Sequence, residues 1–186
     1  CFFGENINIS NDTSTIFESY ISKITKNYRE EILPLKDSLS DIPEMLNYEL
    51  IKSGEIIFNK KRILSIACQS YSYRGGLHGI NSIEYLHFDL NTGQLFYIDD
   101  LFEKNEKQKL LNLVSAKLEK MRKEKEIAIF DESKIESIDN FYFDDDYFYF
   151  VFNPYEIGPY SEGYIKIKID VSEIEPLLKK SIHPWF

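Results

Sequence analysis

The sequence predicts an α+β domain in which helices flank an antiparallel β-sheet, and three observations support this fold class. Hydrophobic residues make up 43% of the 186 residues and charged residues 28%, as is typical of a folded globular chain. Aromatic residues reach 15%, and aromatic side chains favour strands. Several strand-like segments follow one another through short turns, which pairs them antiparallel. The length corresponds to one compact domain of about 100–200 residues.

The N-terminal region predicts a tether followed by a helix. Residues 1–12 are polar and rich in Asn and Ser, as expected of a flexible tether. Apolar residues then recur at helical spacing between Ile16 and Tyr28, which predicts a helix over about 13–32. We expect Pro34 to end this helix, because proline lacks the N–H that a helix interior needs.

The next segments predict hairpin-connected strands. A strand over Met45–Ile51 is followed by Ser53-Gly54, which predicts a hairpin turn that returns through Ile56–Phe58. Two alternating segments, Arg62–Tyr73 and Ile83–Leu90, predict longer strands. The apolar face of these two strands is expected to carry Leu64, Ile66, Cys68, Leu86, Phe88 and Leu90, with Tyr85, His87 and Asp89 on the opposite face.

A tight turn and a long helix are predicted next. Asn91-Thr92-Gly93 predicts the turn, since glycine readily adopts positive φ, and the chain returns through Gln94–Ile98. Asn105 is a good N-cap for a helix over about 105–126, with Gln108 at the capping-box position. The buried stripe of this helix should consist of Leu110, Val114, Leu118 and Met121.

The C-terminal part predicts aromatic strands and a short final helix. The strands Ile138–Phe143 and Tyr147–Phe152 place phenylalanines on one face and tyrosines on the other, because a tyrosine hydroxyl favours water. A turn of aspartates, 144–146, joins them, and a strand at 165–170 follows. We expect Ser172 to cap the last helix. The core should include Phe141, Phe148, Phe150, Leu86, Phe88, Ile165 and Ile167.

The domain is expected to comprise the tether (1–12), an N-terminal helix with strands (13–70) and a C-terminal module packed against them (71–186). Lys and Arg total 22 and Asp and Glu total 31, which leaves a net charge of −9. Such a surface repels nucleic acid and anionic lipid and favours cationic partners. No cysteine pair or HExxH spacing indicates a metal, and the sequence indicates no cofactor.

Cys1 allows two interpretations. It resembles the lipid-modified cysteine of a mature bacterial lipoprotein, which predicts a lipid-anchored protein on the periplasmic or extracellular face of the cell envelope. The alternative is an arbitrary end of the chain.

Two loops stand out as candidate binding segments. The glycine loop, residues 73–79, combines three glycines with Tyr73, Arg74 and His78. Glycines permit unusual backbone geometry, so a bulge or turn between strands is the structural alternative. The tyrosine loop, residues 154–163, exposes tyrosines on a stiff Pro- and Gly-containing connection, or uses them to plug the end of the sheet. The candidate ligand-binding residues are Tyr73, Arg74, Gly76, His78, Tyr155, Tyr160 and Glu162.

Four short motifs, which include both loops, resemble a bacterial extracytoplasmic family of largely unknown function. The family supplies the C-terminal module of lysozyme-sensing anti-sigma factors and a non-catalytic module of some peptidoglycan deacetylases. The motifs that carry the resemblance are, in order, Gly75-Gly76-Leu77-His78, Phe88-Asp89-Leu90-Asn91-Thr92-Gly93, Asp100-Leu101-Phe102 and Tyr155-Glu156-Ile157-Gly158-Pro159-Tyr160-Ser161-Glu162-Gly163. The region before Tyr71 is similar only in outline to the module that usually precedes this one.

The resemblance implies an envelope-facing, non-catalytic module that binds or senses a protein or a wall component. A lysozyme-like cationic protein and a peptidoglycan fragment are the candidate partners that it implies. Two alternatives stay open. One is a cell-wall hydrolase that uses His78 for acid–base catalysis. The other is a structural lipoprotein without a ligand.

Overall fold

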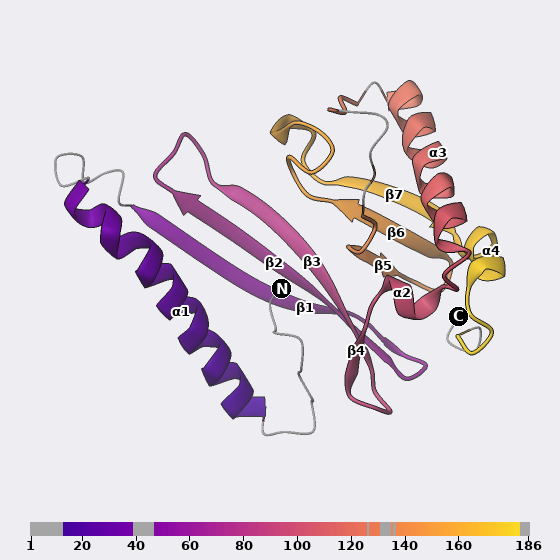
Figure 1. Ribbon diagram of the computed structural model, residues 1–186, viewed down its shortest axis with the longest axis horizontal. Helices are drawn as coiled ribbons and strands as arrows, with labels where there is room; N and C mark the ends of the chain where they lie inside the picture. Colours follow the sequence, from indigo (N-terminus) through magenta and orange to yellow (C-terminus); the bar gives the residue numbers. More distant parts are fainter. Residues whose placement is uncertain (1–12, 39–46, 126, 131–134, 136, 183–186) are drawn as a thin grey trace.

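The computed structural model describes residues 13–38, 47–125, 127–130, 135 and 137–182, so the predicted tether and Cys1 lie outside the described residues. Figure 1 shows a four-stranded and a three-stranded antiparallel sheet with helices beside them, which confirms the predicted α+β class. The elements are α1 (Thr13–Ser38), β1 (Tyr48–Lys60), β2 (Ile63–Arg74), β3 (Ile80–Asp89), β4 (Gln94–Phe96), α2 (Ile98–Leu101), α3 (Lys107–Lys125), β5 (Phe141–Phe143), β6 (Tyr147–Phe152), η2 (Tyr160–Glu162), β7 (Ile165–Asp170), α4 (Val171–Ile174) and η3 (Glu175–Leu177).

The first sheet has the strand order β1-β2-β3-β4, and its first hairpin corrects a predicted turn. Strand β1 runs straight through Ser53-Gly54, where Gly54 pairs with Cys68 of β2. The hairpin turns instead at Lys61 and Arg62, whose φ angles are +49° and +67°. A two-residue turn with both φ angles positive normally carries Asn-Gly, so a Lys-Arg turn has no recognisable sequence signal. The Arg62 side chain donates to the Asp89 carboxylate, which ties the turn to β3.

Helix α1 is longer than predicted and packs against one end of the first sheet. It continues past Pro34 to Ser38, because the fixed φ of proline is itself helical and the remaining residues complete the turn. The Tyr28 ring meets the Tyr48 ring edge-on, with centroids 6.2 Å apart. The Glu31 carboxylate lies 2.6 Å from the guanidinium of Arg74, at the end of β2. These two contacts hold α1 beside the open end of the β1–β2 hairpin (Figure 1).

The second sheet, β5-β6-β7, carries the larger part of the core. The predicted alternation is confirmed, since Phe141, Phe143, Phe148 and Phe150 are at most 2% exposed. Isoleucines of β7 and the stripe of α3 complete this core, and Met121 packs against it. These buried residues are Ile165, Ile167, Ile169, Leu110, Val114 and Leu118. All seven residues predicted for the core are buried, including Leu86 and Phe88 of the first sheet.

Two predicted helix starts are corrected. Helix α3 begins at Lys107, and Asn105 donates its side-chain amide to Glu106 instead of capping the helix. Helix α4 begins at Val171, and its cap is Asp170, whose carboxylate accepts the amide N–H of Ser172 at 2.8 Å. The carboxylate of Asp170, two residues before Ser172, satisfies one of the free N–H groups at the start of the helix, so Ser172 lies inside the helix.

Where the two sheets meet, the predicted polar face of β3 is buried. Tyr85 is 8% exposed and His87 2% exposed, whereas Leu90 is 48% exposed. The second sheet covers the face that carries Tyr85 and His87. The face of β3 with Leu86 and Phe88 packs with Leu64, Ile66 and Leu95, so β3 is buried on both sides.

Candidate functional site

The glycine loop is the turn between β2 and β3, and hydrogen bonds fix its shape. Gly75 adopts a φ of +71°, which starts the turn. The Tyr73 hydroxyl donates to the carbonyl of Gly76 at 2.9 Å, and His78 Nδ1 donates to the carbonyl of Gly79 at 3.0 Å. Gly76 has open space around it. The predicted glycine-built turn is therefore present.

Gly79 leaves room for the side chain of Tyr71. A Cβ atom at Gly79 would overlap the Tyr71 ring, because this ring lies directly against the glycine backbone. The side chain that lies this close to the Gly79 backbone therefore belongs to the same β2–β3 hairpin.

The tyrosine loop connects β6 to β7 and is anchored at its first residue. Asn153 accepts the N–H of Ile83 with its side-chain oxygen at 2.7 Å, and its own N–H donates to Glu156 at 2.8 Å. Within the loop, the N–H of Tyr155 donates to the carbonyl of Gly158 at 3.1 Å. A Cβ at Gly158 would lie 2.7 Å from the carbonyl oxygen of Ala128. The loop therefore also packs tightly against residues 127–130, which follow α3 in the chain.

Tyr155 has an unusual backbone conformation. Its φ is +72°, a region that bulky residues rarely adopt, while its side chain remains 49% exposed. Such strain persists where the surrounding structure holds it in place, and it concentrates at functional sites. Tyr155 is thus an exposed tyrosine whose backbone conformation is fixed by the loop.

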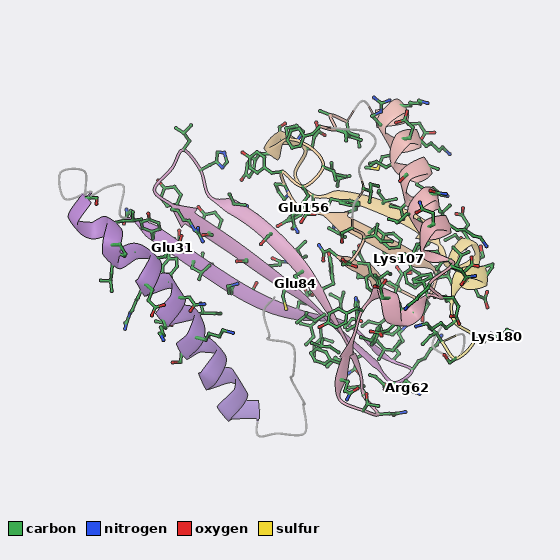
Figure 2. All side chains as sticks on the ribbon, in the orientation of Figure 1. Glu31, Arg62, Glu84, Lys107, Glu156 and Lys180 are labelled. Atoms are coloured by element: carbon green, nitrogen blue, oxygen red, sulfur yellow. The ribbon has the colours of Figure 1, made fainter. Side chains whose placement is uncertain are left out.

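The two loops meet through a ring stack. The His78 and Tyr160 rings stack with centroids 4.3 Å apart and planes inclined by 28°. Tyr155 extends the group, since its ring centroid lies 5.7 Å from that of Tyr160. The turn of one sheet and the loop of the other thus form one surface, which we call the two-loop surface: Tyr73, Gly76, His78, Tyr155, Tyr160 and Glu162. Figure 2 shows the side chains at this end of the molecule.

A groove of about 540 Å³ lies beside the glycine loop. Its lining residues come from the start of β1, the end of β2 and the turn: Asn47, Tyr48, Glu49, Tyr71, Tyr73, Leu77, His78 and Gly79. Leu77, at the tip of the turn, is fully exposed. We call this feature the tyrosine groove.

Of the predicted residues, Arg74 is not part of the two-loop surface, whereas Glu162 is. Arg74 is directed at α1, where Glu31 pairs with it, and no described contact joins it to the tyrosine loop. Glu162 lies in η2, whose first turn it closes with a backbone hydrogen bond to Pro159. Cys1 is outside the described residues. Cys68 is buried, and burial raises the pKa of its thiol to about 11.

Sequence reasoning missed two asparagines that position the site. Asn140 donates to the carbonyl of Ile83 at 2.9 Å and accepts the N–H of Tyr85 at 3.2 Å. Asn153 also bonds to Ile83. Strand β4 pairs with β3 only at residues 87–89, which leaves the earlier part of this β3 edge without a neighbouring strand. The two asparagine amides supply the hydrogen bonds that a strand would make there. The sequence does contain a signal for them, since Asn140 directly precedes β5 and Asn153 directly follows β6. A side-chain amide has the same donor and acceptor as a peptide group, so it can pair with the edge of a strand.

Within the described parts of the chain, no group of three or more His, Cys, Asp or Glu residues is arranged to hold a metal ion. The described helices include none that is long and apolar enough to cross a membrane.

Comparisons with known proteins match both halves of the chain. Residues 99–172 match the family model described as a protein of unknown function (DUF3298), and residues 2–81 match the model described as deacetylase PdaC. The predicted family resemblance is confirmed. The DUF3298 match covers α3, the second sheet and the tyrosine loop, whereas the PdaC match covers α1, β1, β2 and the glycine loop.

Solved structures support the fold. A DUF3298 family member from Bacteroides fragilis superposes with a TM-score of 0.77 at 24% identity, over 96% of this chain and 74% of that one. A DUF3298 family protein from Pseudomonas aeruginosa gives a TM-score of 0.59 at 14% identity, over 72% of this chain and 63% of that one. No curated protein matches the chain. Together, the DUF3298 and PdaC matches suggest a cell-envelope module of unknown function.

Proposed function

We propose that this chain is a non-catalytic binding module of the cell envelope whose two-loop surface recognises an extracytoplasmic protein or a wall component. The observation that supports this proposal is the His78–Tyr160 stack, with ring centroids 4.3 Å apart. The stack joins the glycine loop, which lies in the region that matches the PdaC model, to the tyrosine loop, which lies in the region that matches the DUF3298 model. The candidate partners remain a lysozyme-like cationic protein and a peptidoglycan fragment.

The residue types of the two-loop surface favour binding. Rigid tyrosines provide large contact areas at little cost in conformational entropy. Tyr73 is held by its bond to Gly76, and Tyr160 is held between His78 and Tyr155. Because these side chains are ordered before a partner arrives, less conformational entropy is lost on binding.

Calorimetry against lysozyme and against soluble muropeptides tests the proposal. The double variant Tyr155→Gly with Tyr160→Ala removes two rings from the surface. We expect it to weaken binding by more than about 2 kcal/mol, as for central aromatic contact residues. Tyr97→Ala is the matched control, because Tyr97 is 49% exposed and lies at the start of α2, outside both loops. An unaffected double variant would remove the two-loop surface from the proposal, and absence of heat with both ligands would remove both partners.

The lipid anchor at Cys1 stays a prediction. Mass spectrometry of the native N-terminal peptide tests it, and an unmodified Cys1 would contradict it.

A further inference from the structure

We propose that the tyrosine groove binds a lysine or arginine side chain of a cationic protein partner, a role that deepens the proposed function and rests on it. The groove is lined by Tyr71, Tyr73 and Glu49, which share one face of the β1–β2 ladder, and by the start of β1 at Tyr48. Aromatic ring faces attract cations, and a carboxylate beside them adds charge complementarity.

Two separate contacts position the Tyr71 and Tyr73 rings of the groove. The Tyr71 ring rests on the backbone of Gly79, and the Tyr73 hydroxyl is bonded to the carbonyl of Gly76. The Tyr48 ring is on the opposite face of the ladder, where it packs edge-on against Tyr28 of α1, and it is not one of these two rings. Each ring therefore has a support of its own, and the groove does not have to assemble around the cation.

The charge of the groove is set by Glu49. It is an exposed residue of β1 and is the cross-strand partner of Tyr73. No lysine or arginine is among the lining residues. The nearest cation along the ladder, Arg74, is paired with Glu31 at 2.6 Å, so its charge is compensated locally. The negative charge that remains is that of Glu49.

The overall charge of the chain agrees with this sign. The net charge of −9 favours the approach of a cationic partner. Long-range charge attraction thus brings a basic side chain towards the groove, where the tyrosine rings and the Glu49 carboxylate contact it.

Isothermal calorimetry with a tetralysine peptide at low, fixed ionic strength tests the groove. We expect Glu49→Gln and Tyr73→Leu each to weaken binding by about 3-fold or more. The matched controls are Glu55→Gln, the same charge change further along β1, and Tyr97→Leu; each should change the affinity by less than about 2-fold. Tyr73→Phe keeps the ring and should keep most of the affinity, which shows that a loss in Tyr73→Leu does not come from a disturbed turn.

Peptide chemistry provides the second comparison. Acetylated tetralysine, which has no side-chain charge, should lose binding, whereas trimethyllysine peptide, which keeps the charge, should retain it. Equal effects of Glu49→Gln and Glu55→Gln would overturn the inference, as would binding of the acetylated peptide. A muropeptide that binds the groove where tetralysine does not would also overturn it. The lysine peptide tests the groove separately from the Tyr155 and Tyr160 variants, so failure of one proposal is distinguishable from failure of the other.

Discussion

The imidazole of His87 donates its Nε2 hydrogen to the carbonyl of Phe141 at 2.8 Å and thereby joins the two sheets. The carbonyl can only accept, so Nε2 carries the hydrogen, and Nδ1 accepts from the hydroxyl of Ser65 at 2.8 Å. The ring also stacks between Phe96 and Phe143, with centroids 5.4 and 5.3 Å from its own. His87 is thus a neutral, fully bonded histidine of the interior.

We predict that the protein loses stability between pH 6.5 and pH 4 because of His87. Burial lowers its pKa from 6.5 to about 4, although the bond to Phe141 opposes this shift. Because the unfolded state takes up the proton first, the contribution of the neutral histidine is complete above pH 6.5. It is lost progressively as the pH falls to about 4. The total loss should approach roughly 3 kcal/mol, at about 1.4 kcal/mol per pH unit.

Chemical denaturation across this pH range measures the effect. His87→Gln removes the titrating group and should flatten the dependence between pH 4.5 and 6.5, at the cost of a lower stability at pH 7. Phe150→Ala, which destabilises the core without removing a titrating group, serves as the control and should keep the slope of the parent. A parent protein whose stability is constant from pH 7 to 4.5 would contradict the prediction.

Asn140→Ala should destabilise the junction of the sheets. The change removes the hydrogen-bond partner of the Tyr85 N–H and one of the two side-chain donors to the Ile83 carbonyl, which keeps Asn153. Leaving buried backbone groups unpaired typically costs about 1–3 kcal/mol. Hydrogen exchange should locate the effect, because the amide of Tyr85 should exchange faster than in the parent. Unchanged protection of this amide would show that Asn140 does not close the edge of β3.

Gly79→Ala should disturb the glycine loop, whereas Gly76→Ala should not. The added methyl at Gly79 meets the Tyr71 ring, but a methyl at Gly76 has open space. We expect a loss of about 1–3 kcal/mol for Gly79→Ala in denaturant unfolding. Combining it with Tyr71→Ala should recover part of that loss, since the overlapping ring is gone. If the losses of stability from Gly79→Ala and Tyr71→Ala simply add in the double variant, the two residues are not in direct contact.

Phe150→Ala should cost about 3–5 kcal/mol, because a fully buried ring leaves a cavity that the core cannot fill. Lys166→Ala, an exposed change on neighbouring β7, should alter the stability by less than about 0.5 kcal/mol. Thermal unfolding measures both. A Phe150→Ala protein that melts like the parent would mean that the faces of β6 are assigned the wrong way round.

The sequence by itself determined the elements whose pattern is local. Phenylalanine and tyrosine alternate in β5 and β6 because the two faces of a strand differ in their access to water, and the structure buries the phenylalanines. The spacing of Leu110, Val114 and Leu118 likewise identified the buried face of α3. The turn at Gly93 needed only the positive φ that glycine permits, and its φ is +70°.

Only the tertiary structure decided which surfaces meet. Tyr85 and His87 follow the pattern of an outward face, and they are buried because the second sheet covers them. The β1–β2 turn falls at Lys61-Arg62, where pairing with β2 and the Arg62–Asp89 contact outweigh poor turn residues. The sequence identified the glycine and tyrosine loops separately, but the His78–Tyr160 stack joins residues 82 positions apart. Local preferences act over a few residues, whereas such a contact depends on how the two sheets pack.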